Sequence, residues 1–200
     1  MIDSYFRKSY QEWCVDPLLD LIAARKWNPS IVTAVGLACG IAIMPALALG
    51  AVSWAIALLL ISGYCDTLDG SLARLLRHTT PKGAVFDIVS DRIVEFCIVM
   101  GLFLAAPEAR ALPSLMMLGS ILICVTSFLV VGIFVDNKSH KSFHYSPGIM
   151  ERSEAFLFFG AMILFPTLFP LLAYSFIVLV TLTAIIRVWE FARDCSSMPQ

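Results

Sequence analysis

The stretch DTLDGSLARLLRHTTPKGAVFDIVSD, residues 66–91, sets four aspartates in a chain made largely of apolar runs. Asp66 and Asp69 are three residues apart, so they lie on one face of a helix. Asp87 and Asp91, four residues apart, lie on one face of another. Two neighbouring helices could therefore direct all four carboxylates at one point. Two such charges about 4 Å apart repel by roughly 4 kcal/mol at an effective dielectric of about 20. The pattern predicts that divalent cations bind between these aspartates.

The composition indicates a membrane protein. The chain has 200 residues, of which 59% are hydrophobic and 14% charged, with a mean hydropathy of +0.84 and a formal net charge of −1. These values predict a single integral membrane domain over residues 1–200 rather than a soluble globule. A net charge so close to zero gives no reason to expect a nucleic-acid partner. The cysteines and histidines show no zinc-site spacing, so we interpret the cysteines as packing residues.

Apolar runs recur along the chain at intervals that suit membrane crossings of about 20 residues. They predict an all-α fold with six transmembrane helices inside 31–191, at about 31–50, 51–65, 84–106, 113–135, 153–171 and 171–191. The second run is short and ends at the first aspartates, which places these acids near one membrane interface. Apolar residues at helical spacing before the first span predict an amphipathic interfacial helix within residues 1–30.

The positive charges predict the orientation. They precede the first span, join spans two and three, join spans four and five, and close the chain, whereas the intervening loops hold only Arg110. By the positive-inside rule, both termini and the aspartate cluster are expected in the cytoplasm. Gly36 and Gly40 form a GxxxG pair in the first span, which permits close helix contact either within one chain or between two copies.

Each residue type in the 66–91 stretch has a use in phosphate chemistry. Carboxylate oxygens suit Mg²⁺ or Mn²⁺, which can bridge phosphate oxygens. Gly70, Ala73 and Gly83 lack bulk, so a nucleotide and its pyrophosphate could approach the helix backbone. Arg74 can donate two parallel hydrogen bonds to a phosphate. A carboxylate that is not fully engaged with metal can take a proton from an attacking hydroxyl.

Two other interpretations stay open from the residues alone. The aspartates could cap helices or pair with Arg74, Arg77 or Arg92, although this would account for only one or two of them. A cation transporter could also carry intramembrane aspartates along its pathway. Against the transporter, the acids cluster at one interface, and the glycines and Arg74 would have no role in it.

The stretch resembles the signature of the CDP-alcohol phosphatidyltransferase family, D-x2-D-G-x2-A-R-x8-G-x3-D-x3-D. All eight defining positions are present: Asp66, Asp69, Gly70, Ala73, Arg74, Gly83, Asp87 and Asp91. Upstream, residues 29–33 resemble the family's Pro-Asn-x-x-Thr, with Ser30 in the asparagine position. Asn28 precedes the proline, and it could contact a nucleotide or cap the first helix with Pro29 in its first turn.

The resemblance implies a six-helix membrane enzyme, usually a homodimer, that binds two Mg²⁺ or Mn²⁺ ions. It implies that Asp66, Asp69 and Asp87 are metal ligands and that Asp91 is the general base and can also contact metal. Gly70, Ala73, Arg74 and Gly83 would line the CDP site. The hydroxyl of an acceptor alcohol would attack the lipid-bearing phosphorus of CDP-diacylglycerol and expel CMP. The expected location is the inner or plasma membrane of a prokaryote.

Basic residues of the 136–154 loop and of the last span suggest what the acceptor is. A phosphorylated polyol, such as inositol phosphate or glycerol phosphate, would suit Lys138, Lys141, Arg152, Arg187 and Arg193. The same cations could instead satisfy the positive-inside rule and bind anionic lipids. The segment GIMERSE, residues 148–154, resembles prokaryotic phosphatidylinositol-phosphate synthases. Serine, another neutral or lipid alcohol, and a CDP-alcohol with diacylglycerol as its acceptor stay open as alternatives.

Overall fold

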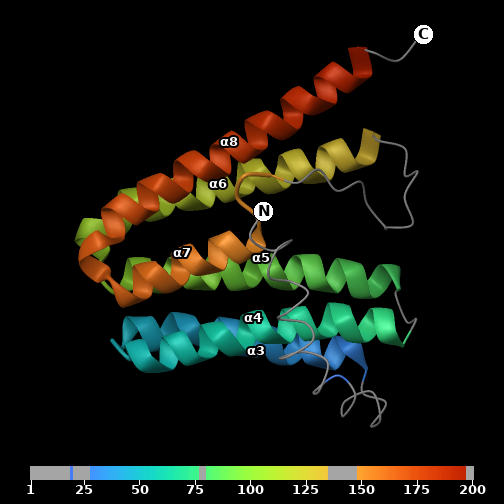
Figure 1. Cartoon of the computed structure of the whole chain (residues 1–200). Helices are drawn as coiled ribbons and strands as arrows, with labels where there is room; N and C mark the ends of the chain where they lie inside the picture. The colour runs from blue at the N-terminus through green and yellow to red at the C-terminus, as the bar shows by residue number, and fades with distance from the viewer. Residues whose placement is uncertain (1–18, 20–27, 77–79, 135–147, 197–200) are drawn as a thin grey trace.

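The computed structural model describes residues 19, 28–76, 80–134 and 148–196, so the interfacial helix expected within 1–30 lies almost wholly outside the described residues. All regular elements of the described residues are helical: α3 (Pro29–Ala48), α4 (Val52–Leu75), α5 (Pro81–Leu104), α6 (Pro107–Phe134), α7 (Arg152–Leu164), the 3₁₀ helix η2 (Pro166–Leu168) and α8 (Phe169–Ser196). Helix α3 packs against both α4 and α5, α6 pairs with α8 and contacts α5, and the short α7 contacts α4, α5 and α8 (Figure 1).

Four helical segments are long and apolar enough to cross a membrane: Pro29–Ala48, Val52–Leu75, Pro107–Phe134 and Pro166–Arg193. Helix α5 is as long as α4 but carries more acidic and basic residues, and α7 has only 13 residues. At 1.5 Å per residue α7 spans about 20 Å, less than the hydrocarbon core of about 30 Å. Outward-facing leucines such as Leu60, Leu122 and Leu171 are about two-thirds exposed. Such a surface is typical of an integral membrane protein, where lipid covers it.

The helix ends can be compared with the apolar runs at two places. The second apolar run ends at residue 65, and α4 continues through Asp66 and Asp69 to Leu75, in agreement with the helical spacing of these aspartates. The last turns of α4 contain polar residues, which end the apolar run. They also contain leucine, alanine and arginine, which have high helix propensity and favour continuation of the helix. The last two spans were expected to meet at residue 171, but α7 ends at Leu164 and Pro166 begins η2. Proline lacks an amide hydrogen and clashes with the preceding turn, so α7 cannot continue through it.

One apolar core joins all six of these α-helices. Its fully buried members include Ile43 of α3, Ile98 of α5 and Met117 of α6. Phe159 of α7 and Phe176 of α8 complete it, with ring centroids 5.4 Å apart. The short helix α7 is therefore held by buried aromatic side chains, although it lacks the length of a membrane span.

Gly36 and Gly40 bring α3 against two neighbouring helices. A Cβ at Gly36 would lie 2.9 Å from the Cβ of Cys65 on α4, and one at Gly40 would lie 2.3 Å from Cγ2 of Val94 on α5. The hydroxyl of Ser62 also donates to the carbonyl oxygen of Gly36 at 2.9 Å. The GxxxG pair thus serves contacts inside one chain, the first of its two expected uses.

The start of α3 shows how Asn28 is used. Its side chain accepts a hydrogen bond from the backbone N–H of Ser30 at 3.1 Å, and Pro29 is the first residue of the helix. An asparagine cap followed by proline is a common helix start, because proline has no amide hydrogen to leave unpaired. The capping interpretation of Asn28 is confirmed.

Candidate active site

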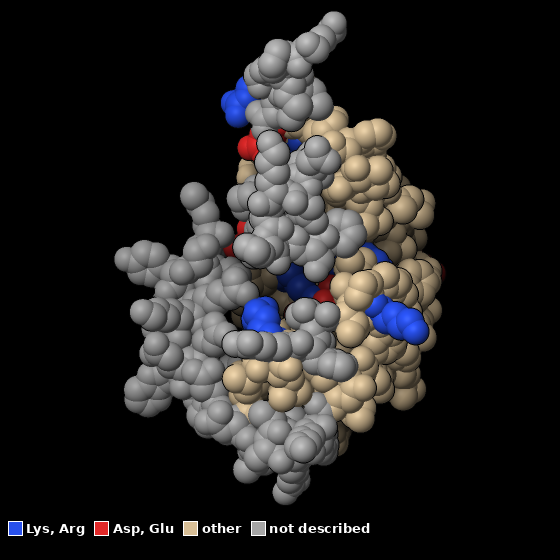
Figure 2. All heavy atoms as spheres, turned by 90° about the vertical axis from the view of Figure 1, so that its right-hand side faces the viewer, with Lys and Arg blue, Asp and Glu red and all other residues tan. Residues whose placement is uncertain are grey.

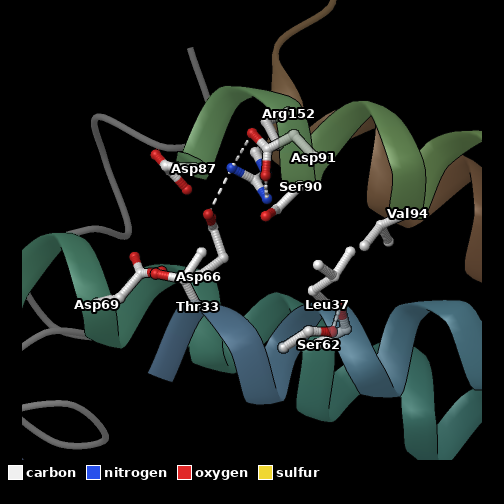
Figure 3. Close-up of a pocket in the computed structure, with 11 residues that line it drawn as sticks. Thr33, Leu37, Ser62, Asp66, Asp69, Asp87, Ser90, Asp91, Val94 and Arg152 are labelled. Atoms are coloured by element: carbon white, nitrogen blue, oxygen red, sulfur yellow. Dashed lines mark hydrogen bonds and ion pairs between the residues drawn. The ribbon is translucent and has the colours of Figure 1, made fainter. Parts of the chain in front are cut away.

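Helices α4 and α5 bring three of the four aspartates together. Carboxylate oxygens of Asp66, Asp69 and Asp87, one from each residue, all lie within 4.8 Å of one another. Figure 3 shows Asp66 and Asp69 on α4 facing Asp87 on α5 across a pocket. The i, i+3 spacing on α4 places two of these carboxylates, and α5 supplies the third.

This donor set fits a hard divalent cation. Carboxylate oxygens are the ligands that Mg²⁺ and Mn²⁺ prefer. Asp69 is only 5% exposed, so its charge needs a partner. The hydroxyl of Thr33 on α3 donates to Oδ2 of Asp69 at 2.5 Å, which orients that carboxylate but does not neutralise it. A cation held by the three carboxylates would offset their mutual repulsion.

The pocket also contains an unpaired hydroxyl. Ser90 of α5 is buried and lines the pocket, and its Oγ has no hydrogen-bond partner in the described part of the structure. A buried hydroxyl without a partner is costly, so a bound molecule would be a favourable partner for it. Sequence reasoning missed Ser90 because a serine between two aspartates of an apolar helix has no distinguishing pattern.

Arg152 lies inside the aspartate cluster. Its Nη1 is 2.5 Å from Oδ1 of Asp66 and 2.5 Å from Oδ2 of Asp91. Its Nη2 donates to Oδ1 of Asp91, so the guanidinium binds both oxygens of that carboxylate. Figure 3 shows the guanidinium between Asp66 and Asp91. Asp91 is therefore joined to the other aspartates through Arg152, a link across 61 residues that its spacing along α5 does not reveal.

The backbone around Arg152 is fixed by contacts on both sides. Arg152 is the first residue of α7, and Glu151 and Glu154 form a reciprocal capping box at this helix start. Just before it, the N–H of Met150 donates to the hydroxyl of the buried Thr183 on α8 at 3.0 Å. A Cβ at Gly148 would lie 2.1 Å from Cγ2 of Thr183, so this turn requires glycine against α8.

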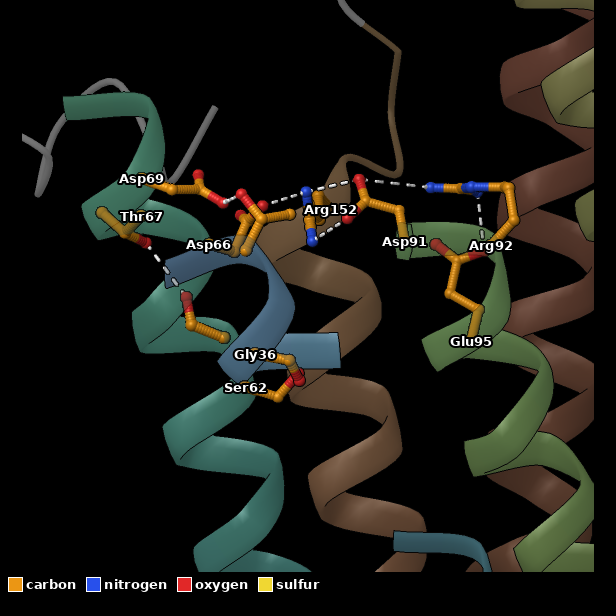
Figure 4. Close-up of polar contacts among 11 residues, drawn as sticks. Gly36, Ser62, Asp66, Thr67, Asp69, Asp91, Arg92, Glu95 and Arg152 are labelled. Carbon is orange, nitrogen blue, oxygen red and sulfur yellow. Dashed lines mark hydrogen bonds and ion pairs between the residues drawn. The ribbon is translucent and has the colours of Figure 1, made fainter. Parts of the chain in front are cut away.

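Charges of alternating sign continue from Asp91 along α5. Arg92 lies 3.9 Å from Oδ2 of Asp91 and donates to Oε2 of Glu95 at 2.6 Å. Glu95 is buried, so this partner reduces the cost of its charge. Figure 4 shows the series from Asp66 through Arg152, Asp91 and Arg92 to Glu95. Removing one member would leave its neighbours unpaired.

The small residues and the arginine of the motif lie at the facing ends of the two helices. Gly70, Ala73 and Arg74 occupy the turns of α4 after Asp69, and the guanidinium of Arg74 donates to the hydroxyl of Ser71 at 3.0 Å. Gly83 is in the first turn of α5, where its N–H donates to the capping side chain of Thr80 at 3.1 Å. Their expected contacts with CDP stay predictions.

The basic residues expected to bind the acceptor have different surroundings in the structure. Arg187 donates to the carbonyl oxygen of Cys124 at 3.1 Å, and its guanidinium lies 5.2 Å from the ring centroid of Phe128, between α6 and α8. The guanidinium of Arg193 lies 5.3 Å from the ring of Trp189. Lys138 and Lys141 lie outside the described residues. Of the candidates that the structure describes, Arg152 is the one seen bonded to the aspartates.

The site is visible from one end of the molecule, where α4 ends and α5 begins. Seen from that end, acidic and basic side chains of described residues are visible close together (Figure 2). The pocket lined by the aspartates and Arg152 provides a polar setting for these charges, whereas many side chains on the described surface are apolar.

Comparisons with known proteins agree with this arrangement. Residues 26–190 match the family model described as CDP-alcohol phosphatidyltransferase. The inner membrane protein YnjF of Escherichia coli (strain K12) is 36% identical over 170 residues, which cover 82% of this chain and 82% of that protein. The CDP-diacylglycerol–inositol 3-phosphatidyltransferase of Rattus norvegicus is 40% identical over 58 residues, 29% of this chain and 27% of the relative.

A solved structure shares the fold. The phosphatidylinositol phosphate synthase of Mycobacterium tuberculosis, a crystal structure with CDP-diacylglycerol bound, matches with a TM-score of 0.72 at 18% identity. The match covers 88% of this chain and 92% of that one. The chain therefore belongs to the CDP-alcohol phosphatidyltransferase family and is a membrane transferase of phospholipid biosynthesis, not a cation transporter.

Proposed function

We propose that this protein transfers a phosphatidyl group from CDP-diacylglycerol to the hydroxyl of a small cytoplasmic alcohol, with release of CMP. The observation that carries the proposal is the convergence of Asp66, Asp69 and Asp87 from two helices of a membrane domain of this family. The donor is supported by the mycobacterial synthase of the same fold, which was solved with CDP-diacylglycerol bound.

Asp66, Asp69 and Asp87 are the residues we assign to two divalent cations, Mg²⁺ or Mn²⁺, with Asp91 as a possible fourth ligand. Cations bound there would neutralise charge on the donor pyrophosphate and on the departing CMP. We assign the binding of CDP to the small residues and the arginine of the motif: Gly70, Ala73, Arg74 and Gly83. Gly70 directly follows Asp69, Ala73 and Arg74 lie about one turn beyond it, and Gly83 lies about one turn before Asp87.

Asp91 is the residue we assign to proton transfer. The acceptor oxygen forms a bond to the lipid-bearing phosphorus as the bond from that phosphorus to the CMP oxygen breaks. CMP leaves with the bonding electron pair, and the proton of the acceptor hydroxyl passes to a carboxylate oxygen of Asp91. The position of Asp91 supports this role, because one guanidinium links it to Asp66 of the metal-binding set.

A phosphorylated polyol is the acceptor that we favour, either inositol phosphate or glycerol phosphate. The guanidinium of Arg152 at the aspartates supports this choice, because it can donate two parallel hydrogen bonds to a phosphate. Lys138 is proposed as a second cation for that phosphate. Arg187 and Arg193 remain candidates for acceptor binding, but Arg187 also contacts Cys124 and Arg193 also contacts Trp189, so both have structural roles as well. Free inositol is the second candidate, because the rat relative is named for inositol. Serine, a lipid alcohol and the reverse CDP-alcohol reaction are the further alternatives.

The test is release of CMP by the purified protein from radiolabelled CDP-diacylglycerol with Mg²⁺ or Mn²⁺. The acceptors are inositol phosphate, glycerol phosphate, inositol and serine, each supplied separately, and a CDP-alcohol with diacylglycerol tests the reverse arrangement. We expect acceptor-dependent CMP release with a phosphate-bearing polyol and its loss when the cation is chelated. No release with any of these acceptors would refute the proposed reaction. Release with only inositol or serine would leave the reaction class and refute the phosphorylated acceptor.

We further propose six membrane spans, with α5 and α7 completing the four apolar ones; the short α7 requires a locally thinner bilayer. We also place both termini and the active site in the cytoplasm of a prokaryote. The name of the Escherichia coli relative supports the inner membrane, and the positions of the basic residues support the orientation. Reporter fusions at each terminus and in each loop test this topology.

We also propose that the protein is a homodimer. The test is the molar mass of the detergent-solubilised protein, measured by light scattering.

A further inference from the structure

We propose that Arg152 is an internal counter-ion that occupies the active site until an anionic acceptor binds. In this role it competes with divalent cations for Asp66 and engages both carboxylate oxygens of Asp91. The inference rests on the proposed function and adds a sequence of contacts at the same site. Arg152 pairs with Asp66 and Asp91 before the acceptor binds, and with the acceptor phosphate afterwards.

The contacts of the guanidinium carry this inference. Both oxygens of Asp91 accept hydrogen bonds from Arg152. A carboxylate that accepts a bidentate arginine has its best-placed lone pairs engaged, so it is a poor base for a hydroxyl. The same Nη1 lies 2.5 Å from Oδ1 of Asp66, which also belongs to the metal-binding set. A cation and a guanidinium repel each other, so they compete for that oxygen.

For Arg152 to exchange the aspartates for an anion, only its side chain must move, and helix α7 can stay in place. The start of α7 is held by its capping box and by the hydrogen bond from Met150 to Thr183. The Arg152 side chain is 32% exposed and flexible along its length, so an anion from solution can reach it.

A phosphate is the chemical class of ligand that suits this exchange. It offers the guanidinium the same bidentate hydrogen bonding as the Asp91 carboxylate, so Arg152 can change partners without losing its pairing. A neutral alcohol or water offers no such replacement and would have to react beside a blocked Asp91. Because coupling between two ligands is reciprocal, an anion that draws Arg152 away must tighten the binding of the divalent cation.

The experiment measures Mn²⁺ affinity by electron paramagnetic resonance of the purified full-length protein, with no donor and no acceptor. Arg152→Gln removes the charge and the bidentate contact. Arg92→Gln is the matched control, because Arg92 also faces Asp91, at 3.9 Å, and its guanidinium pairs with Glu95. We expect Arg152→Gln to bind Mn²⁺ about 10-fold or more tightly than wild type, the effect of one charge-assisted hydrogen bond. The control should change much less.

Sulfate at constant ionic strength is the probe for the exchange itself. It should tighten Mn²⁺ binding in the wild type and leave Arg152→Gln unchanged. If the glutamine variant does not fold, Arg152→Lys keeps a charge that cannot bind both carboxylates in the same way, and we expect an intermediate Mn²⁺ affinity. Unchanged or weaker Mn²⁺ binding in a folded Arg152 variant would overturn the competition. Equal tightening by Arg92→Gln would reduce it to a general charge effect and overturn it too.

The wild-type assay of CMP release keeps this inference separate from the proposed function. Absence of CMP release with every acceptor, together with the expected Mn²⁺ results, would refute the proposed reaction and leave the counter-ion in place. CMP release with a phosphate-bearing polyol, without any sulfate effect on Mn²⁺ binding, would support the reaction and overturn the exchange of partners by Arg152.

Discussion

Replacing Thr33 by valine tests how Asp69, one of the carboxylates proposed to bind metal, is oriented. The Thr33 hydroxyl lies 2.5 Å from Oδ2 of Asp69 and 3.2 Å from the carbonyl oxygen of Pro29. It has a single proton, which the shorter contact with the charged oxygen takes. Asp69 is 5% exposed, so water cannot fully replace the lost donor. A hydrogen bond to a charged group contributes about 1.5–3 kcal/mol, and loss of a partner of a metal ligand costs about 10- to 100-fold in metal affinity or activity.

We therefore expect Thr33→Val to weaken Mn²⁺ binding by about 10- to 100-fold and to raise the Mg²⁺ concentration needed for CMP release by a similar factor. Thr33→Ser is the matched control, because it keeps the hydroxyl and loses only a methyl group. The measurements are Mn²⁺ titration without substrates and the rate of CMP release across Mg²⁺ concentrations. A valine variant with the metal dependence of the wild type would refute the reasoning. So would a serine variant as weak as the valine one, since packing of the methyl would then be responsible.

Three further predictions test the site and the helix packing. Replacing any one of the three convergent aspartates by asparagine should abolish CMP release, because each is proposed to supply an oxygen to the metal site. Gel filtration checks that the variant is folded, and a variant that releases CMP at the wild-type rate would contradict the prediction. Asp91→Asn should bind CDP-diacylglycerol with normal affinity yet fail in transfer, and lost donor affinity with residual transfer would instead make Asp91 a metal ligand alone. Gly40→Ala should lower the melting temperature in detergent, because its Cβ would lie 2.3 Å from Cγ2 of Val94 and overpacking costs about 1–3 kcal/mol. Gly119→Ala is its control, since no heavy atom lies within 4 Å of the added Cβ; equal melting temperatures of the two variants would contradict the packing argument.

The convergence of Asp66, Asp69 and Asp87 could be predicted from the sequence, because it depends on helical periodicity and on one short connection between α4 and α5. The pairing of Arg152 with Asp91 could not, because the two residues are 61 positions apart and charge alone does not select a partner. The sequence predicted only that Arg152 would be cytoplasmic and near an acceptor. The pairing of Arg152 with Asp91 depends on how α7 packs against the other helices.

The helix ends show the same division between local and distant information. The cap of α3 by Asn28 follows from three adjacent residues and was predicted. The end of α7 before Pro166 was missed because a hydropathy run does not register a proline as a helix break. The use of Gly36 and Gly40 stayed open because GxxxG specifies a close approach without naming the partner helix, and Cys65 and Val94 become identifiable only in the folded chain.

The hydrogen bond from Met150 to Thr183 shows that the two parts of the site rest on different helices. The three convergent aspartates belong to α4 and α5, whereas the segment that carries Arg152 is anchored on α8. Substitutions around residues 148–154 can therefore alter the cation presented to the acceptor, and a change of Arg152 itself also removes a partner of Asp66 and Asp91. Among relatives that share the aspartates, differences in this anchored turn and in its contact surface on α8 are the first positions to compare when one member uses a different alcohol.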